Sequence, residues 1–381
     1  EEEGEQGAAG PSAKRQRQEP QQVPQPKSSG SGEGRARAQQ QEDAGGAAAL
    51  GAGPSQPQRL AGAAAWRSGR VSCKHVLLGH TSYIDCLAWS PPTCPTPGLL
   101  ASTHAQEGDQ AIRIWDTQAP VEFRQVLNNG GSDGELHSVA WAPDAPLLAA
   151  GSSSGLVLFS TASWQQAVQL STGWCCVDWC PAGGSTQLAT GDVEGKVQVW
   201  ALDVAGRVGT ATSTLAGHKG FVTRLAYCPS QPHALASTGT RDKTIRVWDT
   251  RSAKCSGVLC GHTHWASYMS WSPCGNKLVS VALVTGRSAL VWDLRQQAVL
   301  HTLGADAGSV AWAPAGDLVA VAERRKSGGP IVQLWCTRQQ QVVAQLEGHA
   351  ERTGPISWSP DACQVATGSR DSAVRVWAPE P

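Results

Sequence analysis

The feature that most constrains this chain is an aromatic residue that recurs at a nearly constant spacing. Each copy closes a short apolar run, as Trp248 does in IRVWD at residues 245–249. The successive spacings are 44, 41, 48, 44, 43 and 42 residues. The seven closing aromatics are Trp115, Phe159, Trp200, Trp248, Trp292, Trp335 and Trp377. A second motif, written LAYCP at residues 225–229, precedes each of them, so the chain repeats one structural unit.

The copy from Gly217 to Asp249 shows what that unit is. Three short apolar runs, FVTRLAY, HALAST and TIRVW, are separated by turn residues. Short apolar or alternating runs bounded by such residues are typical of antiparallel strands. One small sheet cannot bury both of its faces, so each unit needs neighbouring copies of itself.

A Gly-His pair opens this copy and a Trp-Asp pair closes it, and the arrangement resembles the WD40 repeat family. The resemblance covers roughly residues 71–378. It implies an all-β fold, a seven-bladed β-propeller of four-stranded blades over residues 71–381. The last repeat ends at Trp377, directly after its third strand, whereas residues 72–78 form a surplus strand before the first Gly-His. We therefore expect residues 72–78 to close the ring by pairing with residues 373–377.

Residues 1–70 differ in composition from the repeats. They are rich in Gln, Gly, Ala, Pro, Ser and Arg. Their large apolar residues are Val23, Leu50, Leu60 and Trp66. A segment so poor in apolar surface cannot offset its ordering entropy, so we expect a disordered low-complexity arm over residues 1–70. The basic cluster at residues 14–17 is either a nuclear import signal or a solvated run of charge.

Composition narrows the possible partners and cofactors. The 31 Lys and Arg residues balance 31 Asp and Glu residues, which disfavours bulk attraction to nucleic acid. No apolar run approaches the roughly 20 residues that span a bilayer, so we expect no membrane partner. The twelve cysteines are expected to be reduced core thiols. Cys175, Cys176 and Cys180 could suggest a metal site, but they match no paired module, so neither a metal nor a cofactor is expected.

The resemblance implies a buried hydrogen-bonded relay of His, Ser or Thr, Asp and Trp inside the blades. His can bridge two groups, and a buried Trp N–H needs an acceptor. The residues that fit are His218, Thr238, Asp242 and Trp248 in blade four, and His349, Thr367, Asp371 and Trp377 in blade seven. His80, Asp109 and Trp115 form a partial set, and His262 with Trp292 lacks the Asp. A catalytic triad is the alternative, but the recurrence of the set favours structure, so we expect no enzyme and no catalytic residues.

The resemblance also implies a partner-binding face around one end of the central channel. That face carries the loops entering each first strand and the turns between second and third strands. The residues expected there are Tyr83, Phe221, Arg241, Trp265, Arg352 and Arg370. Aromatic residues and arginine are common binding hot spots, so the set suits a protein or peptide partner of acidic character. The alternative is that each ring packs across its blade entrance and only stabilises it.

Three functional hypotheses remain open from the sequence. The first is a non-enzymatic scaffold, monomeric within a nuclear multi-subunit complex, with the cytoplasm as a further location. The stretch Arg241–Cys255 is similar to the THO complex subunit 3 family, nuclear WD40 proteins, which implies a role in mRNA processing and export. The second is a substrate receptor of a ubiquitin ligase. The third is a direct RNA-binding adaptor that uses the Arg-bearing arm and residues 324–326.

Overall fold

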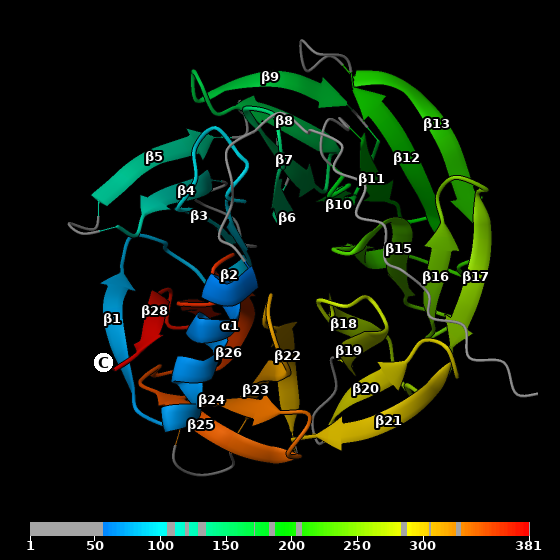
Figure 1. Cartoon of the computed structure of the whole chain (residues 1–381). Coiled ribbons are helices and arrows are strands. Elements are labelled where there is room, and N and C mark those ends of the chain that lie inside the picture. The colour runs from blue at the N-terminus through cyan, green and yellow to red at the C-terminus, as the bar shows by residue number, and fades with distance from the viewer. Residues whose placement is uncertain are drawn as a thin grey trace, which may run out of the picture. The chain divides into compact units, whose positions relative to one another are not determined.

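The computed structural model describes residues 56–104, 111–118, 122–128, 135–170, 172–182, 187–202, 208–282, 288–304, 306–324 and 329–380. All of them belong to one compact unit, Ala49–Pro381. Within this unit seven four-stranded antiparallel sheets are arranged as blades around a common axis (Figure 1). The predicted all-β, seven-bladed propeller is therefore confirmed.

Each of the first three blades comes from one continuous repeat, with its first strand innermost. Blade one consists of β2 (Ile84–Trp89), β3 (Leu99–His104), β4 (Ala111–Asp116) and β5 (Glu122–Asn128). Blade two consists of β6 (Leu136–Trp141), β7 (Leu147–Ser152), β8 (Leu156–Ser160) and β9 (Gln165–Leu170). Blade three consists of β10 (Cys176–Trp179), β11 (Gln187–Gly191), β12 (Lys196–Leu202) and β13 (Val208–Ala216).

The next three blades have the same plan. Blade four consists of β14 (Val222–Cys228), β15 (Gln231–Gly239), β16 (Ile245–Asp249) and β17 (Lys254–Leu259). Blade five consists of β18 (Ala266–Trp271), β19 (Lys277–Ala282), β20 (Ala289–Asp293) and β21 (Ala298–Leu303). Blade six consists of β22 (Ala307–Trp312), β23 (Leu318–Glu323), β24 (Ile331–Cys336) and β25 (Gln341–Glu347).

Blade seven combines the two ends of the repeat array. Its strands are β26 (Thr353–Trp358), β27 (Val365–Ser369), β28 (Val374–Pro379) and β1 (Val71–Leu77). β1 pairs antiparallel with β28, and Val76 lies opposite Arg375. The predicted closure is confirmed, and it removes the exposed edge that β28 would otherwise present.

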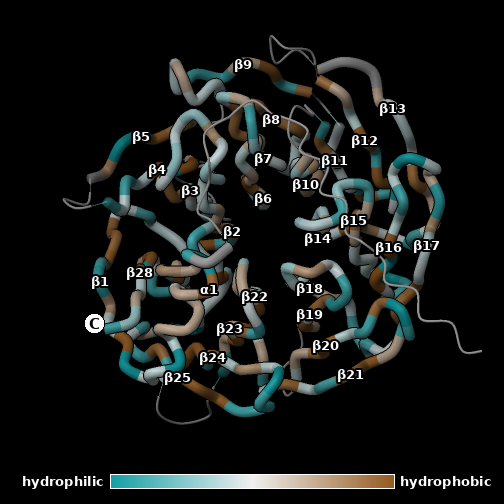
Figure 2. The backbone as a smooth tube through the Cα atoms, in the orientation of Figure 1, coloured by the Kyte–Doolittle hydropathy of each residue, from teal (hydrophilic) through white to brown (hydrophobic). Residues whose placement is uncertain are grey.

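The core lies between adjacent blades rather than within any one of them. Most residues of the two inner strands are buried, and Figure 2 shows hydrophobic residues along the strands and hydrophilic ones in many of the turns. In five of the blades the Trp of the second sequence motif crosses this boundary, because its indole Nε1 donates to a backbone carbonyl of the adjacent blade. These bonds are Trp89 to Ser357 (3.2 Å), Trp141 to Ala88 (2.9 Å), Trp179 to Ala140 (3.0 Å), Trp271 to Ala226 (2.8 Å) and Trp358 to Ala311 (3.2 Å).

The expectation of disorder through residue 70 is wrong for residues 56–70. Gln56–Ala65 form helix α1, and Trp66–Ser68 form a 3-10 helix, η1. Trp66 is fully buried, and its Nε1 donates to the carbonyl of Ala362 at 2.9 Å. Two features compensate for the shortage of apolar residues. The large ring of Trp66 is the first. The second is the small residues of α1, which let its backbone approach blade seven closely, so that a Cβ at Gly62 would lie 2.7 Å from the carbonyl oxygen of Asp361.

The ring has two faces, which carry different sets of turns. The helix face carries α1 and the turns between first and second strands, and it is the near side in Figure 1. The loop face is the opposite end, which carries the segments entering each first strand and the turns between second and third strands. Residues 1–55, including the basic cluster at 14–17, lie outside the described residues. No helix among the described residues is long and apolar enough to cross a membrane.

Candidate functional site

A chain of hydrogen bonds runs through blade four from the closing tryptophan to a turn carboxylate. Trp248 Nε1 donates to Ser237 Oγ at 2.7 Å, and His218 Nε2 lies 2.7 Å from the same oxygen. His218 Nδ1 lies 2.8 Å from Asp242 Oδ2. Because a carboxylate can only accept, Nδ1–H of His218 donates to Asp242. Burial lowers the pKa of His218, so the neutral ring accepts at Nε2 from the Ser237 hydroxyl, which in turn accepts from Trp248.

Thr238 is not part of this chain, which corrects the sequence prediction. Its hydroxyl instead pairs with Thr223 Oγ1 at 2.8 Å and accepts from the backbone N–H of Arg224. Blade four has one more residue than blade seven between the strand hydroxyl and the turn aspartate. Successive strand residues point to opposite faces, so this one-residue offset moves the role from Thr238 to Ser237.

Blade seven forms the chain with all four predicted residues. His349 Nδ1 lies 2.9 Å from Asp371 Oδ2, and His349 Nε2 lies 2.8 Å from Thr367 Oγ1. Trp377 Nε1 donates to the same threonine oxygen at 2.8 Å. Burial lowers the pKa of His349, although Asp371 partly opposes that shift. Burial alone would raise the pKa of Asp371, but the His349 hydrogen bond and two backbone N–H groups bring it below its ordinary value. The pair is thus a neutral imidazole and a charged carboxylate.

Blades one and five contain shorter versions of the chain. His80 and Trp115 meet at Ser102, at 2.7 Å and 2.8 Å, while Asp109 lies outside the described residues. In blade five His262 and Trp292 meet at Ser280, both at 2.7 Å. Burial lowers the pKa of His262 to about 4, with no carboxylate among the causes of the shift.

These chains are structural elements rather than reactive groups. The side chain of His218 is 0% exposed and that of His349 is 3% exposed, so no substrate can reach their imidazoles. A nucleophile and its base must meet the substrate in a cleft. The chains instead tie the segment entering the first strand of a blade to the second and third strands and fix their register.

The residues predicted for partner binding fall into two groups on the loop face. Around blades seven and one, Arg370 lies over Tyr83, with its Cζ 5.7 Å from the ring centroid. The backbone N–H of Arg370 donates to the carbonyl of Arg352 at 3.0 Å. Arg370 is exposed, whereas Arg352 and Tyr83 are half-buried. These three residues are brought together by the closing blade and its neighbour.

The second group lies over blades three to five. Phe221 is 49% exposed and its ring centroid lies 6.4 Å from that of Trp174. Arg241 is exposed, and its Cγ lies close above Gly220. Trp265 is 38% exposed directly before β18. The alternative that each ring packs across its blade entrance describes Tyr83 better than Phe221 or Trp265.

Arg324 belongs to the loop face and was not predicted there. It comes directly after β23, and its backbone N–H donates to the carbonyl of Asp306 at 3.0 Å, as Arg370 does to Arg352 in the next blade. The sequence signal that could have placed Arg324 on the loop face is its position directly after a second strand. Blade six has neither a Gly-His pair nor a turn Asp from which to count, so the sequence could not align it. Arg325 and Lys326 lie outside the described residues.

Sequence reasoning also missed a buried arginine that crosses the centre of the ring. Arg224 in β14 donates from Nε to the carbonyl of Ser267 and from Nη1 to that of His137, both at 3.1 Å. Its Cζ lies 5.0 Å from the ring centroid of Tyr268. Burial raises the pKa of Asp85, and Arg224 opposes that shift. Arg224 therefore links the inner strands of blades two, four and five.

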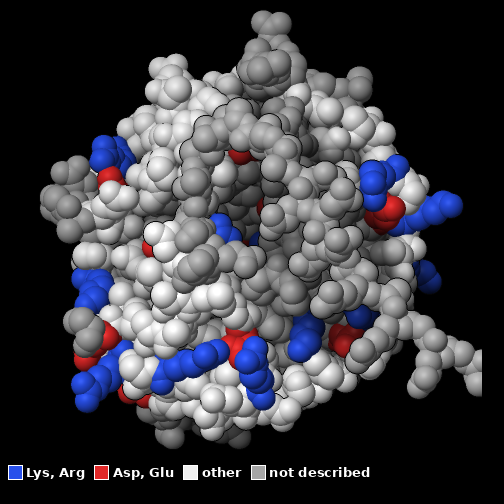
Figure 3. Space-filling view, in the orientation of Figure 1, with Lys and Arg blue, Asp and Glu red and all other residues white. Residues whose placement is uncertain are grey.

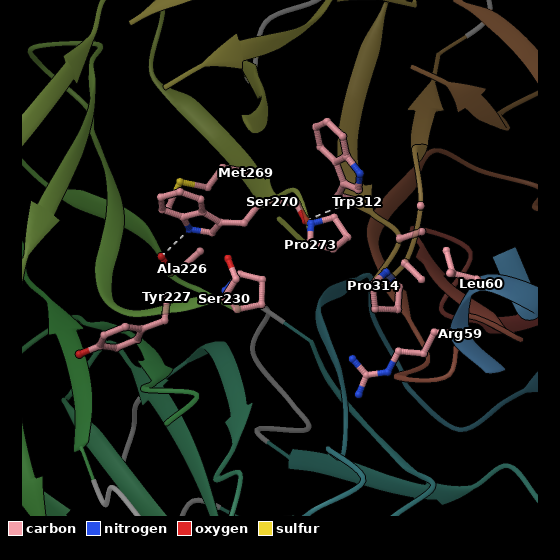
Figure 4. A pocket seen from close by; sticks show the side chains of 15 residues that line it. Arg59, Leu60, Ala226, Tyr227, Ser230, Met269, Ser270, Pro273, Trp312 and Pro314 are labelled. Carbon is pink, nitrogen blue, oxygen red and sulfur yellow. Dashed lines mark hydrogen bonds between the residues drawn. The ribbon is translucent and has the colours of Figure 1, made fainter. Parts of the chain in front are cut away.

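The helix face contains a hollow of about 610 Å³ beside α1 (Figure 4). Trp271, Pro273, Trp312 and Pro314 form apolar walls, and Arg59 of α1 contributes a further side. Figure 3 shows the Lys and Arg residues of this face mainly towards its edge. The sequence did not predict the hollow because α1 was not expected to form.

Comparisons with known proteins agree with this architecture. The family profile "WD domain, G-beta repeat" matches residues 71–116, 209–249 and 340–378. The chain carries WD40 repeats. The first two matched segments end at the Trp-Asp pairs of blades one and four, and the third contains the closing Trp377 of blade seven.

Curated relatives of this WD40 chain are distant. Nuclear distribution protein PAC1 of Arthroderma otae is 27% identical over 320 residues, covering 71% of this chain and 65% of the relative. Cell division cycle 20.1, cofactor of APC complex, of Arabidopsis thaliana is 24% identical over 338 residues, covering 82% of this chain and 62% of the relative. Protein transport protein sec13 of Aspergillus clavatus is 27% identical over 234 residues, covering 53% of this chain and 78% of the relative. The chain thus spans less than two thirds of the length of the first two relatives.

Proposed function

We propose that this WD40 chain is a non-enzymatic protein-interaction scaffold that binds its partner through the loop face. The observation that carries the proposal is that the loop face leaves Phe221 and Trp265 49% and 38% exposed, and also carries the exposed arginines Arg241 and Arg370. Large rings left in water at loop ends have no structural role that requires exposure, whereas they are typical anchors in interfaces. The relative named as a cofactor of a complex is consistent with a propeller that acts through other proteins.

The test compares partners retained by variants of the loop face with those retained by matched variants elsewhere. Trp265→Ala and Arg370→Ala should each release bound proteins in a pull-down followed by mass spectrometry. Leu300→Ala in β21, also 38% exposed, and Arg295→Ala in the turn before β21 should retain them. Unchanged partners for both loop-face variants would contradict the proposal, and ligase subunits among the partners would favour a ubiquitin-ligase substrate receptor.

The finer proposal is that the chain acts as one copy within a nuclear complex of mRNA processing or export. The basic cluster at residues 14–17 and the likeness of Arg241–Cys255 to THO complex subunit 3 proteins support it. Replacing Lys14, Arg15 and Arg17 by Ala should shift a fluorescent fusion from nucleus to cytoplasm. A fusion that stays nuclear, or partners without any mRNA-binding protein, would contradict it.

A further inference from the structure

Three arginines meet at the inner end of blades six and seven on the loop face. Arg324 comes after β23, Arg352 precedes β26 and Arg370 comes after β27. Their backbones are held by the bonds Arg324 N–H to Asp306 and Arg370 N–H to Arg352, each 3.0 Å long. The cluster, called here the arginine triad, therefore sits on the edges of rigid sheets.

Two side chains of the triad lie beside one glycine. A Cβ atom placed on Gly308, in the innermost strand β22, would lie 3.7 Å from Nε of Arg324 and 3.7 Å from Nε and Nη2 of Arg352. Arg370 lies over the ring of Tyr83, close enough for its charge to act on both of the other arginines. Gly308 is buried, and a Cβ there would make only ordinary van der Waals contacts with these nitrogens, so a small side chain at this position would lie against the guanidinium groups.

In the described part of the chain, like charges act on Arg324 and Arg352 of the triad. Burial and the charges of Arg324 and Arg370 lower the pKa of Arg352 to about 10, and burial and Arg370 lower the pKa of Arg324. Asp306 opposes the lowering of the pKa at both arginines, and Tyr268 also opposes it at Arg352. The nearby Glu323 carboxylate lies against Gly304 instead. Among the described residues, Asp306 is thus the carboxylate that acts on both Arg324 and Arg352, in a place where partial burial strengthens the repulsion between the arginines.

We propose that Arg324, Arg352 and Arg370 anchor adjacent carboxylate side chains of an acidic peptide segment in the protein partner. The proposal rests on the proposed function, since it assigns a chemical class to the partner bound at the loop face. A guanidinium group matches a carboxylate through paired N–H donors, and such charge-assisted bonds are about twice as strong as neutral ones. The incoming carboxylates relieve the repulsion within the triad, so binding is coupled to a local gain in stability.

The geometry favours a peptide over RNA. The triad is a compact site beside one glycine, whereas a nucleic acid strand needs a basic groove that tracks many phosphates. The chain also has a formal net charge of zero, which provides no general attraction for a polyanion.

The test measures fluorescence anisotropy of the full chain with a short fluorescein-labelled polyglutamate peptide, and with polyglutamine as the uncharged comparison. Polyglutamate should bind and polyglutamine should not. Arg352→Gln and Arg324→Gln should each weaken binding by about tenfold, because each removes a charge-assisted contact. Arg295→Gln, a change of the same kind outside the loop face, should leave binding unchanged.

Gly308 provides a sharper pair of variants. Gly308→Asp places a carboxylate between the arginines and should abolish peptide binding while raising the melting temperature. Gly308→Asn has the same size without the charge and should bind within about threefold of the unsubstituted chain. Equal loss in both variants would show that only space matters and would overturn the proposal.

Other outcomes separate this proposal from the broader one. A labelled oligouridylate tests RNA as the ligand. If it binds more tightly than polyglutamate, and if the arginine variants lose that binding, the triad would be a site for RNA and not for an acidic peptide. Failure of polyglutamate to bind, while Trp265→Ala still releases partners, would overturn the triad's role and leave the scaffold proposal standing. If polyglutamate binds but neither Trp265→Ala nor Arg370→Ala changes the partners, the scaffold proposal would be overturned and the triad's affinity for carboxylates would stand.

Discussion

At the scale of single residues, the buried chains show how a few polar atoms fix a blade. The hydroxyl of Thr367 serves two partners at once, because Trp377 donates to it and it donates to His349. Removing this one oxygen orphans two buried groups, and orphaned groups cost more than the bonds themselves contributed.

Thr367→Val removes the hydroxyl and keeps the shape of the side chain. We expect it to lower the free energy of unfolding by about 3 kcal/mol in a urea titration, because two buried polar atoms lose their partner. Thr367→Ser keeps the hydroxyl and should cost only about 1 kcal/mol for the lost methyl group. If the two variants were equally stable, the hydrogen-bonded chain of blade seven would have no energetic role.

His262 predicts a dependence of stability on pH. Its pKa of about 4 in the folded protein lies below the ordinary value of 6.5. Between these two pH values the unfolded protein therefore binds a proton at His262 and the folded protein does not. The stability from this residue is complete above pH 6.5 and is lost as the pH falls towards about 4, by about 3 kcal/mol in total. His262→Gln should flatten the fall of the urea midpoint over this range, and an unchanged pH profile would contradict the assignment.

At the scale of elements, α1 and η1 depend on one anchor. Trp66 is fully buried, stacks edge-on against Trp358 with centroids 5.4 Å apart, and donates to Ala362. Because this ring provides the main apolar contact of the segment, the segment can be released while the ring of blades stays folded.

Trp66→Ala should therefore release α1 without unfolding the blades, at a local cost of about 3–5 kcal/mol. Hydrogen exchange of the α1 amides should become fast, while that of β26 to β28 stays slow. Leu60→Ala, at a residue 53% exposed on the same helix, is the control and should leave α1 protected. Slow exchange of α1 in the Trp66 variant would contradict this account.

At the scale of the whole molecule, ring closure is the property that each blade depends on. β1 supplies the outer strand of blade seven and pairs with β28 along its length. Without β1 the edge of β28 is free to pair with other chains.

A variant that begins at Gly79 should aggregate or melt at a clearly lower temperature than the full chain. A variant that begins at Gln56 keeps α1 and β1 and should match the full chain. Size-exclusion chromatography with thermal unfolding measures both. A monomeric variant from Gly79 with an unchanged melting temperature would mean that β1 does not close the ring.

The sequence by itself determined the seven blades, their strand periods and the closure of the ring. These depend on local patterns: apolar alternation, turn residues and two motifs repeated in phase. It also located the four-residue chain of blade seven, where spacing from the Gly-His pair to the closing Trp could be counted directly.

Only the tertiary structure decided what depends on contacts between segments distant in the chain. It placed Ser237 rather than Thr238 in blade four, because one extra turn residue changed which side chain faces the histidine. It ordered residues 56–70, because a single indole found a slot between turns that lie some 300 positions away in the chain. It also brought Arg324 beside Arg352 and Arg370, because adjacent blades present their turns at one edge. Local sequence patterns do not predict that proximity.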